Sequence, residues 1–249
     1  DWHVLNDQNP KRYQEQAKTF FKEMSEKYAG QENVLYEICN EPNGGTSWDD
    51  IRSYAQEIIP LIRANDPDAV VIVGTPTWSQ DVDIAADKPL EYNNVLYAFH
   101  FYAATHRESY REKVKTAIAK GLPVFVSEFG VSEASGNGNM DTNEAGQWLD
   151  LLDANGIGYV AWSLSNKAET ASLLKAGSSK TSGWSKGDLS AAGKWILSQY
   201  SLRSGAATQQ PGIAVSKVKR LKLYRKTAGR SRVQFAPVAG ADGYQVVYS

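Results

Sequence analysis

Two glutamates stand directly after apolar runs of the kind that form buried strands. Glu41 follows residues 34–40 and precedes Pro42, and Glu128 ends the run 124–128. A carboxylate in that position is a poor core residue, and the residue before a proline is held in an extended conformation. If the two strands lie side by side, their carboxyl groups can face each other. Two carboxyls about 5 Å apart can cleave a glycosidic bond with retention, one as acid/base and one as nucleophile.

Further polar or aromatic residues end other apolar runs, and these are His3, Thr75, His100 and Trp162. The runs alternate with amphipathic stretches, which indicates a parallel sheet covered by helices. The predicted strands are residues 1–5, 34–40, 70–73, 95–99, 123–126 and 158–161. The predicted helices are residues 10–28, 48–65, 108–120, 143–155 and 191–200, with a kink or break at Pro60.

An open doubly wound sheet and a (β/α)₈ TIM barrel would both contain such strands. Functional residues at the ends of strand after strand favour the barrel, whose sites are built at the carboxyl ends of several strands. Six strands are two fewer than a barrel needs. We therefore expect an α/β fold in which a barrel over residues 1–200 lacks its first two βα units.

The chain changes character after the last predicted helix. Residues 201–212 are rich in Ser, Gly, Ala and Gln, which is typical of a linker. Residues 213–249 carry eight Lys/Arg and one Asp, a net charge of +7, so the rest carries −8 of the total −1. Their alternating pattern predicts a short β-rich tail, and residues 240–248 resemble the start of a fibronectin type III-like module.

Charge and composition bear on partners and location. An acidic body argues against nucleic acid as the main ligand. The basic tail could contact anionic cell-wall polymers or form a solvated sheet face. No run approaches the ~20 apolar residues of a membrane span, and no signal peptide is visible at the start. Cys39 is the single cysteine and lies in an apolar run, so we predict that it is buried.

An ordered set of motifs resembles family 5 glycoside hydrolases, specifically bacterial endo-β-1,4-glucanases (cellulases). The match covers residues 1 to about 200. It includes DWH at 1–3, YEICNEPNG at 36–44, VGTPTWSQDV at 73–82, YAFHFYA at 97–103, FVSEFG at 125–130 and WSLSNK at 162–167. The resemblance implies hydrolysis of cellulose or related β-glucans by double displacement, without metal or cofactor, and an extracellular location.

The resemblance also implies roles for individual residues. Glu41 would be the acid/base and Glu128 the nucleophile, with Tyr102 bonded to that nucleophile. The expected substrate-binding residues are His3, Asn40, Trp78, His100, Tyr102, Trp162, Lys167 and Glu169. Trp162 would be a sugar platform followed by a cis peptide bond, and Trp78 would stack on the leaving-side sugar.

Two alternatives to the cellulase interpretation stay open. A relative that cleaves mannan, xyloglucan or mixed-linkage glucan would share the fold and the carboxylates, although the match at Lys167 and Glu169 favours glucan. A non-catalytic carbohydrate-binding fragment is the other, and the missing barrel units are its support.

Overall fold

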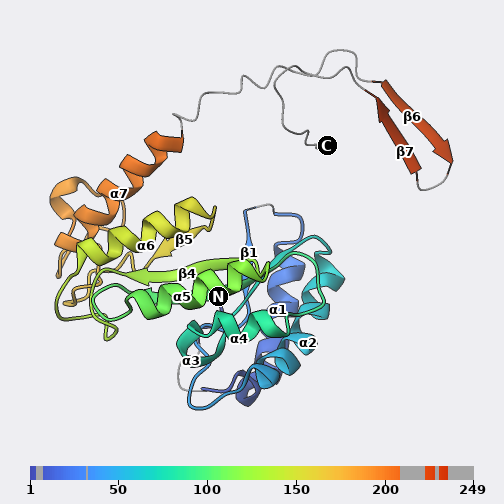
Figure 1. Ribbon diagram of the computed structural model, residues 1–249, viewed down its shortest axis with the longest axis horizontal. Coiled ribbons are helices and arrows are strands. Elements are labelled where there is room, and N and C mark those ends of the chain that lie inside the picture. Colours follow the sequence, from blue (N-terminus) through green and yellow to red (C-terminus); the bar gives the residue numbers. More distant parts are fainter. Residues whose placement is uncertain (4–7, 32, 208–221, 228–229, 235–249) are drawn as a thin grey trace. The chain divides into compact units, whose positions relative to one another are not determined.

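The computed structural model describes residues 1–3, 8–31, 33–207, 222–227 and 230–234, and a five-stranded parallel sheet lies within residues 1–196 (Figure 1). The neighbouring strands follow the order of the chain and all pair in parallel. In a doubly wound sheet the order of the strands reverses at a switch point. Strands that lie side by side in chain order throughout are typical of a barrel wall. The strands are β1 (Leu35–Glu37), β2 (Val70–Val73), β3 (Val95–Tyr102), β4 (Val124–Gly130) and β5 (Tyr159–Ala161).

Helices connect the strands, with α1 beside α2 and α4 beside α5 (Figure 1). Local sequence signals explain where several begin. The Asn9 side chain caps the first turn, Ser47 and Asp50 form a capping box before α2, and Asp141 caps α6. The helices are η1 (Pro10–Tyr13), α1 (Gln14–Lys27), α2 (Trp48–Asn65), α3 (Pro76–Ser79), α4 (Val82–Asp87), α5 (Glu108–Ala119), α6 (Thr142–Ala154), η2 (Lys186–Asp188) and α7 (Ala191–Ala207).

A kink or break was predicted at Pro60, and the helix does not break there, because α2 is continuous from Trp48 to Asn65. Pro60 lies on the exposed side of the helix. The carbonyl group left without a partner there can therefore bond to water. The buried side chains of Ile58, Ile59 and Ile62 hold the opposite side of the helix against the core.

Several strand predictions need correction, and the strand predicted at 34–40 is shorter, Leu35–Glu37. Asp1–His3 form no strand, although the Trp2 amide donates to the Glu37 carbonyl at 2.9 Å, and residues 4 and 5 lie outside the described residues. The strands β3 and β4 run three and four residues beyond their predicted ends. Predictions stopped at the first polar residue, but inside a barrel a polar residue can continue the strand.

Alternation along β3 separates core residues from site residues. Tyr97 contacts Trp48 of α2, and Phe99 and Phe101 contact Trp148 of α6, with the Phe101 and Trp148 rings stacked at 4.3 Å. Because neighbouring side chains in a strand point to opposite faces, His100 and Tyr102 point to the other face, the inside of the barrel wall. The helix layer thus fixes the strand that carries two predicted site residues.

The chain divides into two compact units, residues 1–196 and 197–249. Helix α7 continues to Ala207, so the first seven residues of the predicted linker are helical. In the second unit, β6 (Lys222–Thr227) and β7 (Arg230–Gln234) form an antiparallel pair. The residues that resemble a fibronectin type III-like module, 240–248, lie outside the described residues.

Two composition-based predictions can be checked within the described residues. Cys39 is buried, as predicted. No helix among the described segments is long and apolar enough to cross a membrane.

Candidate active site

Glu41 and Glu128 meet over the inside of the sheet. Glu41 follows β1 and Glu128 lies in β4, and a carboxylate oxygen of each lies within 4.8 Å of the other and of a His100 ring nitrogen. Both carboxylates are largely shielded from solvent, with side-chain exposures of 17% and 8%. This separation fits a retaining pair, because an inverting pair needs about 6.5 to 9.5 Å to admit a water.

Close approach between two chain segments fixes Glu41. The end of β2 passes so near the Asn40–Pro42 turn that a Cβ at Gly74 would collide with the Cys39 carbonyl oxygen. The Ser79 hydroxyl donates to the Asn40 carbonyl at 2.7 Å, and the Trp78 amide donates to the Pro42 carbonyl at 2.9 Å. The turn that carries Glu41 is therefore held by a side-chain and a backbone donor of the neighbouring segment, which bond to its carbonyl groups.

An extra residue in β4 brings Glu128 to the inside. Ala98 pairs with Phe125 and His100 pairs with Glu128, so two steps along β3 match three steps along β4. This is a β-bulge, which breaks the alternation of side chains. As a result Ser127 and Glu128 both reach His100, while Phe129 stacks on Phe101 in the core.

Tyr102 contacts the Glu128 carboxylate directly. Its hydroxyl donates to Oε1 at 2.7 Å. Burial raises the pKa of Glu128 above its ordinary value, and Glu41 adds to this, while His100 and the Tyr102 bond oppose it. Burial and the Glu128 charge raise the pKa of Tyr102 as well, which keeps the phenol a proton donor.

His100 lies between three carboxylates. Nδ1 is 2.9 Å from Glu41 Oε1 and 3.9 Å from Glu128 Oε2, and Nε2 is 3.8 Å from Glu37 Oε1. Complete burial would lower the pKa of His100, but Glu37, Glu41 and Glu128 outweigh it and raise the pKa to about 9. At neutral pH the ring is therefore a cation.

Among the described His, Cys, Asp and Glu side chains, one group has the composition and closeness of a set of metal ligands. It consists of Glu41, His100 and Glu128. A protonated imidazole has no free lone pair for a metal ion. The 2.9 Å contact between His100 Nδ1 and Glu41 Oε1 also allows these two side chains to exchange a proton.

A second set of predicted residues extends from the pair. Asn40 Nδ2 lies 3.3 Å from His3 Nε2, and the His3 ring stacks on Trp162 with a centroid distance of 5.1 Å. The Asp1 carboxylate lies 2.5 Å from His3 Nδ1. The Trp162–Ser163 peptide bond is cis, as the resemblance implied. An aromatic surface thus continues from the carboxylates.

On another side of Glu41, a pocket of about 350 Å³ opens between the α3 segment and β3. Trp78 lies beside it, 49% exposed, in a run of left-handed backbone from Thr77 to Ser79. Such strain is concentrated at functional sites. Sequence reasoning placed Trp78 here but did not select two further lining residues, Gln80 and Tyr110.

The sequence alone does not decide whether His106 is a core residue or a site residue, and the structure gives it both surroundings. Its Nδ1 accepts the Tyr102 amide at 2.8 Å, and Nε2 lies 3.3 Å from the Gln80 side-chain amide. Burial lowers the pKa of His106 to about 4, so the ring is neutral at neutral pH. The feature of the sequence that could have assigned His106 to the site is its position four residues after Tyr102.

Lys167 and Glu169 lie in the loop after Trp162, with a distance of 4.0 Å between Nζ and Oε1. The Lys167 side chain is 68% exposed. Glu169 contributes to the raised pKa of Tyr102, which relates it to the carboxylate pair, while no described contact joins Lys167 to that pair.

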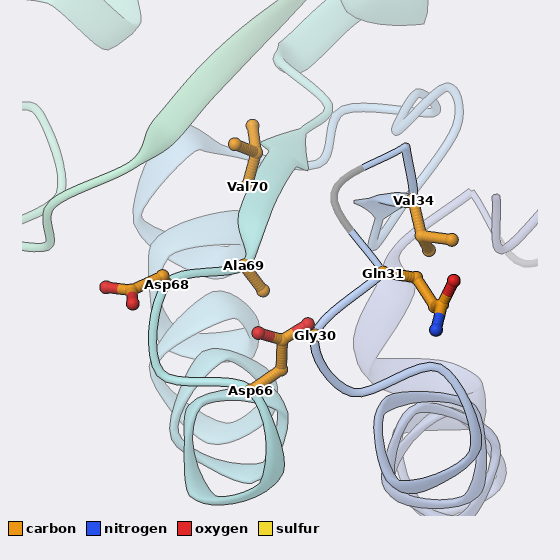
Figure 2. A pocket seen from close by; sticks show the side chains of 7 residues that line it. All are labelled: Gly30, Gln31, Val34, Asp66, Asp68, Ala69 and Val70. Atoms are coloured by element: carbon orange, nitrogen blue, oxygen red, sulfur yellow. The ribbon is translucent and has the colours of Figure 1, made fainter. Parts of the chain in front are cut away.

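A separate pocket of about 300 Å³ lies at the opposite ends of β1 and β2 (Figure 2). Figure 2 shows Asp66 directed toward Gly30 and Asp68 directed away. Barrel enzymes use the carboxyl ends of the strands for chemistry and the amino ends for stability. This pocket is therefore not our candidate site.

The family model described as "Cellulase (glycosyl hydrolase family 5)" matches residues 1–168. The chain belongs to glycosyl hydrolase family 5. Curated relatives include an endoglucanase from Clostridium saccharobutylicum, 53% identical over 79% of this chain and 44% of its own length. Endoglucanase N from Pectobacterium atrosepticum is 48% identical over 83% and 46%. The chain thus spans less than half the length of these relatives.

Solved structures of family 5 enzymes agree with the fold. "Cellulase Cel5C_n" matches with a TM-score of 0.78 and 47% identity, covering 81% of this chain and 62% of that one. The catalytic domain of Thermobifida fusca endoglucanase Cel5A, in complex with cellotetraose, matches with a TM-score of 0.77 and 40% identity, covering 81% and 68%. The five-stranded sheet is accordingly part of a (β/α)₈ barrel.

Proposed function

We propose that the chain is most of the catalytic domain of a retaining endo-β-1,4-glucanase that hydrolyses cellulose or related β-glucans. The observation that carries this proposal is the approach of Glu41 and Glu128 to within 4.8 Å at the carboxyl ends of the strands. A solvated pair of strand ends would not require burial, a tyrosine donor and a histidine cation around it.

The reaction would proceed in two displacements. In the first, Glu128 attacks the anomeric carbon, the glycosidic C–O bond breaks, and Glu41 gives its proton to the leaving oxygen. In the second, Glu41 takes a proton from a water whose oxygen attacks the anomeric carbon and releases Glu128. The Tyr102 hydroxyl supports the charged form of Glu128 before attack.

Aromatic side chains on two sides of the carboxylates support a polymeric sugar as substrate. Trp162 and His3 stack on one side, and Trp78 lies exposed beside the pocket on another. Flat rings of this kind suit the apolar faces of sugars, while Asn40 offers an amide to a sugar hydroxyl. Lys167 and Glu169 would bind glucose units farther along.

The choice of glucan rests on the relatives, which are named endoglucanases and include a structure with cellotetraose. An extracellular location belongs to the same proposal, because polymeric glucan does not enter cells. Contact of the basic tail with cell-wall polymers is a further part of the proposal, supported by its charge alone.

The test is reducing-sugar release from carboxymethyl-cellulose by residues 1–249, with Glu128→Gln as the matched inactive variant. In parallel, a 2-fluoro cellobioside with a good leaving group should add one 2-fluorocellobiosyl group, which is two sugar units, to Glu128, seen by peptide mass. Release and labelling that both vanish in the variant are expected. Faster release from mannan would instead indicate a mannanase. Tight glucan binding without release or labelling would overturn the proposal in favour of a carbohydrate-binding fragment.

A further inference from the structure

A chain of hydrogen bonds runs behind the carboxylate pair and ends on a third acidic residue. His100 Nε2 lies 2.9 Å from the Ser127 hydroxyl, and that hydroxyl lies 2.5 Å from Glu37 Oε1. The three side chains come from β3, β4 and β1, and the Glu37 side chain is only 12% exposed. A carboxylate shielded to this degree needs partners, and Ser127 is the one it has at hydrogen-bonding distance among the described contacts.

The β4 bulge is what makes this chain of bonds. With regular alternation, either Ser127 or Glu128 would face the helix layer. The additional residue between Phe125 and Glu128 instead turns both toward His100. One irregularity therefore places a carboxylate at one ring nitrogen and a hydroxyl at the other.

The hydrogens available to these side chains determine which ring nitrogen of His100 is protonated. The Ser127 hydroxyl has one hydrogen, and an ionised Glu37 can only accept, so Ser127 donates to Glu37. Ser127 must then accept from His100, so the hydrogen of this bond has to be on Nε2. The other nitrogen, Nδ1, is left facing Glu41 Oε1 at 2.9 Å.

We propose that Glu37 and Ser127 are positioning residues that hold His100 protonated on Nε2, so that Nδ1 and Glu41 share one proton. When that proton is on Glu41, its O–H donates to Nδ1, and when it is on Nδ1, the ring donates to Glu41. This inference rests on the proposed role of Glu41 as acid/base. It adds that the proton used on the leaving oxygen belongs to a pair of residues rather than to Glu41 alone.

The charges around the ring support this arrangement. Glu37 and Glu41 face His100 from the β1 segment, Glu128 faces it from β4, and the Tyr102 phenol lies on its own strand. His3 adds a smaller influence on Glu128. Three carboxylates around the His100 ring favour its protonated form. Of the three, Glu37 is the one that does not also contact sugar in the proposed reaction.

The tautomer can be tested without catalysis, on ¹⁵N-histidine-labelled protein, by titrating the imidazole resonances. His3→Gln and His106→Gln variants assign the His100 signals. We expect both His100 nitrogens to be protonated at pH 7 and only Nε2 to be protonated above pH 9. A neutral ring protonated on Nδ1 would overturn the proposal.

Variants test which residues set this state. Glu37→Gln should move the His100 midpoint down by roughly 1 to 3 pH units, since it removes an adjacent anion. Ser127→Ala should abolish the preference for Nε2 in the neutral ring, and Ser127→Thr, which keeps the hydroxyl, should retain it. Glu91→Gln is the matched control, because Glu91 is exposed near the opposite end of β3. Equal midpoints in Glu37→Gln and Glu91→Gln would refute the role of Glu37.

Activity adds a second readout. In Glu37→Gln the alkaline limb of the kcat/KM profile should move to lower pH together with the His100 midpoint. A uniform loss of rate at all pH values would show a merely structural effect. Because the resonance titration needs no turnover, an inactive chain would count against the proposed function while leaving the test of Glu37 and Ser127 intact.

Discussion

Removing one hydroxyl from the site should change the pH at which the nucleophile becomes active. Tyr102→Phe keeps the buried ring but deletes the O–H that donates to Glu128 Oε1 at 2.7 Å. A hydrogen bond to a charged group contributes about 1.5 to 3 kcal/mol, and 1.36 kcal/mol corresponds to one pH unit. Loss of this donor disfavours the ionised carboxylate. The midpoint of the acidic limb of the kcat/KM profile should therefore move to higher pH by about 1 to 2 pH units.

The assay is kcat/KM between pH 3 and 9 on a soluble aryl cellooligosaccharide, so that polymer solubility does not vary with pH. Tyr159→Phe is the matched control, since it deletes a hydroxyl that bonds Asp153 on the surface. The control should keep the acidic limb of the unmodified chain. A Tyr102→Phe profile with an unmoved acidic limb would refute the claim that this hydroxyl stabilises the charged nucleophile.

Three further outcomes follow from the same contacts. Gly130→Ala places a Cβ 2.6 Å from the Tyr102 ring, so we expect kcat/KM to fall by up to about a hundredfold and the melting temperature to drop. Burial raises the pKa of Glu128, so its ionisation opposes folding at neutral pH. The Glu128→Gln variant should therefore have a higher melting temperature than the unmodified chain at pH 7. Below pH 4 this difference should vanish, because the side chain at position 128 is then uncharged in both proteins. Burial lowers the pKa of His106 to about 4, so its contribution to stability is present above pH 6.5 and is lost as the pH falls to 4. Chemical denaturation should show a shallower loss over that range in His106→Gln, and an equal slope would contradict the assignment.

The sequence alone determined most of the scaffold. Apolar runs identified all five strands of the parallel sheet, and an apolar stripe predicted the helix 48–65 at its observed bounds, where the structure adds a capping box. Motif spacing also selected Glu41 and Glu128, since a carboxylate after an apolar strand has few structural explanations. These features are local, and local propensity and periodicity report them directly.

Tertiary structure alone decided how the candidate residues meet. The strand-end rule brought Glu41 and Glu128 to one edge, but the bulge at Ser127 depends on register between β3 and β4, which no periodicity in either strand reveals. The same register turned Glu37, which looks like any strand glutamate in sequence, into a partner of His100 through a hydroxyl. Charge state follows from such contacts, because burial and neighbouring charges exist only once the strands are paired.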